Sequence, residues 1–157
     1  MALNAYLKLK GQNQGDIKGS GREDKIMVIA SNHSIFSVLD ERSGIPGKRM
    51  HKPFVVTKEV DKSTPFLYNA LVSKEDIYEW ELEFWKLNAS GAELQYYTVK
   101  LGNAKIASIE FHMPNNKHPE LMKFMEYEEI AFTYQDIEWI WEENGVSASA
   151  DWVATGE

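Results

Sequence analysis

The sequence feature that most limits the possible folds is a strict alternation of side-chain type across residues 76–87. The apolar positions are Tyr78, Trp80, Leu82 and Phe84, and the acidic positions between them are Glu79, Glu81 and Glu83. Because successive side chains of a strand point to opposite faces, one face of this strand is apolar and the other is acidic. The pattern is typical of an antiparallel sheet with one solvated face, so we expect the three glutamates to be exposed.

The same period of two predicts further strands along most of the chain, over residues 5–10, 25–39, 50–60, 94–101, 104–113 and 130–141. The polar run 31–34 predicts a bulge or bend in the second of these. One helix is expected over about residues 65–72, where capping side chains precede Pro65 and apolar residues follow at helical spacing. The expected fold is therefore mainly β: a two-sheet antiparallel β-barrel or sandwich with one short flanking α-helix.

The last predicted strand changes phase. Its apolar residues occupy even positions up to residue 134 and odd positions from residue 137. A regular strand cannot bury both sets on one face, so either a bulge lies at residues 135–136 or the strand serves two surfaces in turn. The second set, whose members are candidates for a contact outside the subunit's own core, consists of Ile137, Trp139 and Trp141.

A length of 157 residues favours one domain, which we place at residues 1–144, followed by a small, polar C-terminal tail at 145–157. The first residues lack the basic start and apolar run of a signal peptide. No stretch approaches the roughly 20 apolar residues of a membrane helix. We therefore expect no membrane insertion.

Charge and composition exclude several function classes. The net charge is −7, and phosphate recognition needs clustered Lys and Arg, so nucleic acid is not an expected partner. The absence of cysteine excludes disulfides, a thiol nucleophile and cysteine-based metal sites.

No catalytic constellation stands out. There is no Gly-x-Ser-x-Gly elbow, and Arg49 stands where a phosphate loop would need Ser or Thr after its lysine. Two histidines and two glutamates flank one loop, but isolated residues of these types are usually polar surface, and zinc sites need tighter spacing. These residues are Glu110, His112, His118 and Glu120. The sequence therefore predicts a protein that is not an enzyme and has no cofactor or metal.

Two binding functions stay open at this point. The aromatic residues near the C-terminus, Trp139, Trp141 and Trp152, could stack on sugars in a monomeric ligand- or carbohydrate-binding β-barrel module. Aromatic residues near a chain end are as often part of a core or an interface.

One family resemblance runs through the chain in order. Residues 52–71 contain the junction Asp61, Lys62, Ser63, Thr64 and Pro65. Residues 5–11 and 15–19 precede this run, and residues 137–141 and 150–152 follow it. Together these segments resemble the haemolysin-coregulated protein (Hcp) family, the tube proteins of bacterial type VI secretion.

The resemblance implies a β-barrel of two sheets with a flanking helix, six subunits in a ring, and rings stacked into a tube. It implies a spike protein, a contractile sheath and effector proteins as partners. It also implies a protein that waits in the bacterial cytoplasm and is then secreted without a signal peptide.

With that resemblance, residues 40–49 become a candidate for ring or stacking contacts. The segment is longer than the 2–5 residues that a hairpin loop needs. Its opposite charges suit a head-to-tail contact, and its proline limits the ordering cost on docking. The candidate residues are Asp40, Glu41, Arg42, Ile45, Pro46, Lys48 and Arg49.

Overall fold

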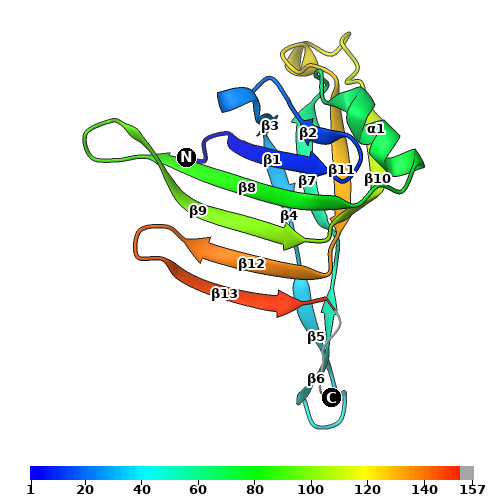
Figure 1. Ribbon diagram of the computed structural model, residues 1–157, viewed down its shortest axis with the longest axis vertical. Coiled ribbons are helices and arrows are strands. Elements are labelled where there is room, and N and C mark those ends of the chain that lie inside the picture. Colours follow the sequence, from blue (N-terminus) through cyan, green and yellow to red (C-terminus); the bar gives the residue numbers. More distant parts are fainter. Residues whose placement is uncertain (153–157) are drawn as a thin grey trace.

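The computed structural model describes residues 1–152 and consists of two antiparallel sheets and a projecting hairpin (Figure 1). The larger sheet has seven strands, in the order β13-β12-β9-β8-β1-β2, with β3 also paired to β1. Its strands are β1 (Ala5–Gly11), β2 (Gly15–Ile17), β3 (Ile26–Val28), β8 (Ile77–Leu87), β9 (Glu93–Gly102), β12 (Asp136–Trp141) and β13 (Val146–Asp151).

The smaller sheet has four strands in the order β10-β11-β7-β4. These are β4 (Ala30–Asn32), β7 (Phe54–Glu59), β10 (Lys105–His112) and β11 (Tyr127–Thr133). A separate two-stranded hairpin, β5 (Ile35–Leu39) with β6 (Pro46–His51), projects away from both sheets (Figure 1). One α-helix, α1 (Thr64–Val72), and two short 3-10 turns, η1 (Arg22–Asp24) and η2 (Pro119–Leu121), complete the described elements.

The core lies between the two sheets and follows the alternation seen in the sequence. Trp80 and Leu82 of β8 are buried, and they share the core with Phe132 of β11 and Phe54 of β7. The rings of Phe54 and Phe132 pack edge-on against Trp80, with centroids 5.1 and 5.6 Å away. Helix α1 joins this core through Leu67 and Ala70, which are 0% and 1% exposed. Burial of this apolar surface is the main stabilising term.

The opposite face of the large sheet is charged, as the alternation predicts. Three carboxylates of β8 pair with lysines of neighbouring segments: Lys8–Glu79 at 3.0 Å, Lys100–Glu81 at 3.1 Å and Lys25–Glu83 at 2.8 Å. The expectation that all three glutamates are exposed is wrong: Glu79 and Glu81 are half-buried, and Glu83 is 6% exposed because Lys25 covers it. The paired charges leave little of this face uncompensated.

The expected elements are confirmed in part. Helix α1 and the strands over 5–10, 76–87, 94–101 and 104–113 are confirmed within a few residues. The single strand expected over 25–39 is divided into β3, β4 and β5: one break, at 33–34, falls within the expected 31–34, and a second, at residue 29, was not expected. The strand expected over 50–60 is interrupted at 52–53. The two sheets do not close into a barrel. Figure 1 shows the larger sheet lying across the smaller one.

The phase change in 130–141 has a clear origin. The chain leaves β11 in the small sheet and enters β12 in the large sheet, so each set of apolar residues faces the same core from a different side. Neither explanation is observed as stated: the expected single strand is two strands, separated between Thr133 and Asp136, and the second set returns to the same core instead of another surface.

The residues after Gly145, expected to be a tail, are strand β13 as far as Asp151, paired along the whole of β12. Residues 153–157 of the expected tail lie outside the described residues. Small side chains at 147–150 allow this strand to add to the sheet, although their composition is not typical of a strand.

Candidate assembly interface

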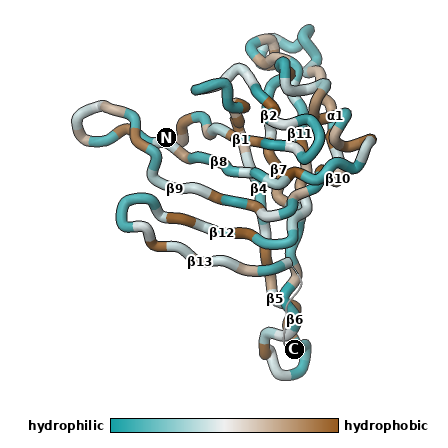
Figure 2. The backbone as a smooth tube through the Cα atoms, in the orientation of Figure 1, coloured by the Kyte–Doolittle hydropathy of each residue, from teal (hydrophilic) through white to brown (hydrophobic). Residues whose placement is uncertain are grey.

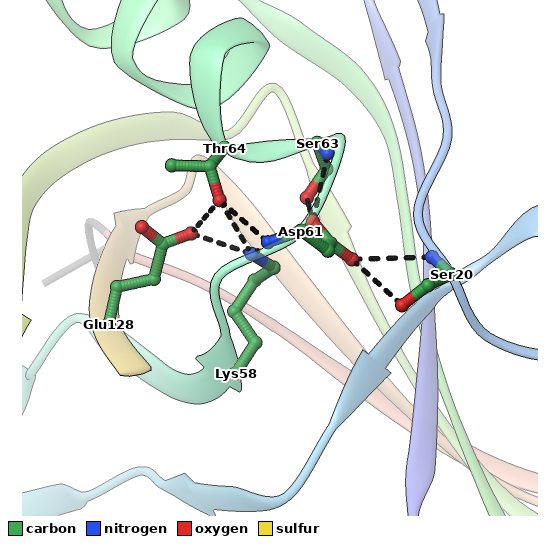
Figure 3. A network of polar contacts seen from close by, with 6 residues as sticks. All are labelled: Ser20, Lys58, Asp61, Ser63, Thr64 and Glu128. Carbon is green, nitrogen blue, oxygen red and sulfur yellow. Dashed lines mark hydrogen bonds and ion pairs between the residues drawn. The ribbon is translucent and has the colours of Figure 1, made fainter. Parts of the chain in front are cut away.

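The junction Asp61–Pro65 is the centre of a buried polar network that joins the small sheet and the segment at Ser20 to the start of α1 (Figure 3). Lys58 of β7 and Glu128 of β11 are 0% exposed, and their Nζ and Oε1 atoms are 2.6 Å apart. Lys58 Nζ also lies 3.1 Å from Asp61 Oδ1. The hydroxyl of Thr64 donates to Glu128 Oε1 at 2.9 Å and accepts from the backbone N–H of Asp61 at 3.1 Å. A buried charge pair needs such additional hydrogen bonds to offset its desolvation.

Asp61 connects this network to the N-terminal region. Its Oδ1 accepts the backbone N–H of Ser63 at 2.8 Å, and its Oδ2 accepts the backbone N–H of Ser20 at 3.3 Å. Burial would raise the pKa of Asp61, but the hydrogen bonds from Ser63 and the charge of Lys58 outweigh it and hold the pKa below its ordinary value. Ser63 is the N-cap residue of α1, yet its hydroxyl does not cap the helix, because it donates to Asp61 instead.

Gly19 explains how the Ser20 segment approaches so closely. A Cβ atom at residue 19 would lie 2.6 Å from the Cα of Ile26 and 2.9 Å from Asp61 Oδ2. Only glycine fits there without displacing backbone. The other two junction residues lie at the edge of the network. Lys62 is exposed, and its Nζ atom is 3.8 Å from Asp24 Oδ1. Pro65 occupies the first turn of α1.

The projecting hairpin β5–β6, which we call the arm, carries exposed apolar side chains between hydrophilic stretches (Figure 2). Its exposed large apolar side chains are Phe36, Val38, Leu39, Ile45 and Met50. The prediction of a ten-residue loop at 40–49 is wrong, because residues 46–49 belong to β6 and only 40–45 form the turn. In the sequence, a glycine between two apolar segments is the signal for such a hairpin. In the structure, Gly44 has a φ of +69°, a conformation that favours glycine.

The arm holds the first set of candidate residues, but they are not equally free. Asp40 Oδ1 accepts the backbone N–H groups of Arg42 and Ser43 at 2.8 and 3.1 Å, and these bonds lower the pKa of Asp40. Arg49 is half-buried and donates from Nη2 to the carbonyl of Asp151 at 2.8 Å. Asp40 therefore shapes the turn and Arg49 anchors the arm to β13. Glu41, Arg42, Ile45, Pro46 and Lys48 remain exposed.

A histidine–tyrosine–tryptophan cluster forms the base of the arm. Arg49 Nε donates to His51 Nε2 at 2.9 Å, which leaves His51 Nδ1–H to donate to the hydroxyl of Tyr134 at 2.7 Å. The Tyr134 hydroxyl in turn donates to His33 Nε2 at 2.9 Å. Trp152 packs edge-on against Tyr134, with ring centroids 4.8 Å apart.

Burial explains the acid–base properties of this cluster. Burial lowers the pKa of both His33 and His51. The positive charge of Arg49 lowers the pKa of His51 further, and a proton on His51 would lower that of His33. Burial also raises the pKa of Tyr134 to about 12, against a smaller opposing effect of Arg49. Near neutral pH, the side chains of His33, Tyr134 and His51 are therefore uncharged, and the hydrogen bonds that join them lead to the charged guanidinium of Arg49. Nothing in the sequence spacing pointed to this cluster, because it unites four distant segments.

The second set of candidates lies on β12, apart from the arm's turn. Ile137 is 0% exposed and belongs to the subunit's own core, so the idea that it leaves the core is wrong. Trp139 is half-buried against the same core, and Trp141 is 39% exposed. Of the three, Trp141 offers the most surface for a contact with another molecule. The three tryptophans proposed as a sugar platform differ in environment, since Trp152 is part of the cluster at the base of the arm.

Comparison with known proteins decides the family. The family model described as "Type VI secretion system effector, Hcp" matches residues 6–141. The chain belongs to the Hcp family of type VI secretion. As an Hcp protein it is 37% identical over 166 aligned positions to the "Major exported protein" of Pseudomonas aeruginosa, covering 97% of this chain and 96% of that relative.

Solved Hcp structures share the fold. The chain matches a crystal structure of an Hcp protein with a TM-score of 0.90 and 33% identity, over 96% of this chain and 98% of the other. It matches a mutant of the Hcp1 protein from E. coli EAEC 042 with a TM-score of 0.85 and 30% identity, over 97% and 100% of the two chains. The open two-sheet architecture and the arm are thus described here for a secreted type VI protein. Over residues 1–152 no helix is long and apolar enough to cross a membrane.

Proposed function

We propose that this Hcp protein is a non-enzymatic structural subunit that assembles head to tail into six-membered rings, which stack into the tube of a type VI secretion machine. The observation that carries the proposal is the arm, an apolar hairpin that belongs to neither sheet and contacts its own subunit mainly at its base. An isolated two-stranded hairpin is marginally stable in water. A neighbouring subunit that covers the arm would bury its exposed apolar side chains and so stabilise the hairpin.

The sheet edges support the same assembly. β13 ends the large sheet, and β10 and β4 end the small one. Unpaired strand edges invite pairing with other chains, and a head-to-tail contact that closes covers them without leading to open fibres. Six copies would carry six times the net charge of −7, so the contacts must be largely apolar or must pair opposite charges.

The arm supplies both kinds of contact. Its turn combines the acidic Glu41 with the basic Arg42, and Lys48 follows in β6. Ile45 lies between Arg42 and Lys48 in the chain, and the other exposed apolar residues of the arm flank the charged turn. An apolar centre with a charged rim is the usual anatomy of a specific protein interface.

The partners and the cellular route belong to the same proposal. The tube would be capped by a spike protein, driven by a contractile sheath, and loaded with effector proteins. The subunits would wait in the bacterial cytoplasm and leave the cell when the machine fires. The relative named "Major exported protein" supports export.

Native mass spectrometry and negative-stain electron microscopy test the proposal, on the wild type and on a variant with a shortened arm. In the variant, Asn-Gly replaces residues 38–48, because Ser37 and Arg49 are register partners that a two-residue turn can join. We expect wild-type rings of six chains that stack into tubes, and a folded variant that fails to form tubes and is not exported.

A matched control replaces two exposed charges outside the arm, with Lys117→Gln and Glu120→Gln. It keeps the whole arm, so it should still form rings. A wild type that is monomeric at tens of micromolar, or a shortened variant that is assembled and exported normally, overturns the proposal.

A further inference from the structure

The outer face of the small sheet brings together three side chains of the types that bind metal ions. Glu110 and His112 lie two residues apart on β10 and therefore on one face, and Glu110 is the register partner of Glu129 on β11. One ligand atom from each of the three residues lies within 4.8 Å of the other two. His112 Nε2 is 3.8 Å from Glu129 Oε1.

The imidazole of His112 is held in place but lacks a hydrogen-bond partner. Its ring stacks on Tyr127, its register partner on β11, with centroids 5.0 Å apart and planes 19° apart. The Nε2 atom exposes less than 1 Å² to solvent, and among residues 1–152 no donor or acceptor satisfies it. A nitrogen shielded from water and unpaired costs free energy unless something else binds it.

The two carboxylates present a second unsatisfied interaction. Like charges directly opposite each other on neighbouring strands destabilise a sheet. The carboxylates of β8 each pair with a lysine, as Glu79 and Glu81 do. In the described part of the chain, neither Glu110 nor Glu129 has a lysine or arginine within 4.0 Å. A cation between the two carboxylates and the imidazole would satisfy all three groups.

We propose that Glu110, His112 and Glu129 bind a divalent transition-metal ion of the zinc class, with a fourth coordination position open to water or to another ligand. Zinc binds His nitrogen at about 2.0–2.1 Å and carboxylate oxygen at about 2.0–2.2 Å. Two such ligands at a tetrahedral angle lie roughly 3.4 Å apart. The 3.8 Å gap between Nε2 and Oε1 therefore closes with a shift of a few tenths of an ångström in the Glu129 side chain.

The ligand types select among cations. A shielded imidazole nitrogen suits zinc, copper or nickel, whereas magnesium and calcium prefer oxygen ligands alone. The stacked Tyr127 fixes the ring plane and so reduces the ordering cost of binding. The sequence had grouped His112 with His118 and Glu120, but these two are exposed in the following loop, and the third ligand comes from β11 instead.

All three ligands, on β10 and β11, come from one chain, so zinc binding can be tested separately from the proposed function. It is tested by calorimetric titration of ZnCl2 into the untagged chain, after dialysis against a chelator and then against metal-free buffer. We expect one zinc per chain, and at least tenfold weaker binding in His112→Ala and in Glu129→Gln.

The matched control is His118→Ala, which removes an exposed histidine from the neighbouring loop and should bind zinc as the wild type does. Should His112→Ala fail to fold by circular dichroism, Glu110→Gln provides the same test with an isosteric change. Cobalt substitution adds a second readout, because a four-coordinate site gives strong visible absorption. The proposal is overturned if the wild type binds no zinc at 1 mM, or if His112→Ala binds zinc as tightly as the wild type.

Discussion

Replacing Lys58 by methionine tests the buried network at the start of α1. Methionine preserves the length and most of the volume of the side chain but removes its charge and its donors. Lys58 Nζ is the cation for two carboxylates, Glu128 at 2.6 Å and Asp61 at 3.1 Å. The substitution therefore leaves Glu128, which is 0% exposed, without a positive partner in the core.

The magnitude follows from which group is left unpaired. Removing one partner of a buried ion pair costs about 3–5 kcal/mol, because the other charge remains buried and uncompensated. Glu128→Gln should cost less, about 1–3 kcal/mol, since Lys58 keeps Asp61 as its counter-ion. The double variant should cost less than the sum of the two single variants, because their effects are coupled through direct contact.

Urea denaturation followed by tryptophan fluorescence measures these differences. The chain concentration must be equal in all samples, since the stability of an oligomer depends on it. In thermal unfolding, a loss of about 3–5 kcal/mol corresponds to a fall in Tm of roughly 6–20 °C for a chain of this size. A Lys58→Met protein within 1 kcal/mol of the wild type, or a Glu128→Gln protein that is the less stable of the two, would refute the reasoning.

Three further predictions concern other parts of the molecule. Trp141→Ala should weaken ring assembly at least tenfold with little change in subunit stability, whereas Trp139→Ala should cost the subunit about 1–3 kcal/mol, because it packs against the core. Because their folded pKa values are depressed, His33 and His51 contribute stability that is present above their ordinary pKa and is lost as pH falls through the folded values. The protection factors of the arm's amides, which correct for the intrinsic pH dependence of exchange, should therefore fall between pH 7 and pH 5. Gly19→Ala should cost about 1–3 kcal/mol in urea denaturation, since its Cβ would overlap backbone.

Each of these predictions has a control. Analytical ultracentrifugation compares Trp141→Ala with the wild type, and unchanged association would remove Trp141 from the interface. A His51→Gln protein should lose most of the pH response of the arm, while exposed His118→Gln should keep it. For residue 19, the comparison is Gly47→Ala, where the nearest atom to an added Cβ is 3.1 Å away, and equal stability of the two variants would contradict the argument.

The sequence predicts the local structure well where a single physical pattern dominates. The alternation around Trp80 and Leu82 gives a strand and its buried face, and the proline after a polar junction gives the start of α1. The phase change before Ile137 is visible as well, but its meaning is not, because a move to the opposite sheet and a move to another subunit produce the same pattern.

The candidate site is harder to predict, because its contacts join segments far apart in the chain. Lys58 and Glu128 are separated by 70 residues, and His33 and Tyr134 by 101. Each of these residues looks like ordinary polar surface in its local segment. Only the folded structure shows that they come together: Lys58 and Glu128 are register partners of β7 and β11, and Tyr134 bonds to His33. The zinc-site ligands show the same difficulty, since spacing along the chain suggested His118 and strand register brings Glu129.

The order of strands in the small sheet also determines when the protein can fold during its synthesis. Strand β7 pairs with β11, whose first residue, Tyr127, is made 68 residues after Glu59. At about 5–20 residues per second, ribosomes need roughly 3–14 s to cover that distance. Until then β7 has only β4 beside it, and Lys58 has no Glu128 to pair with. The apolar face of an unfinished sheet is thus exposed for seconds on every nascent chain. A cell that produces this protein in quantity must protect that intermediate from aggregation.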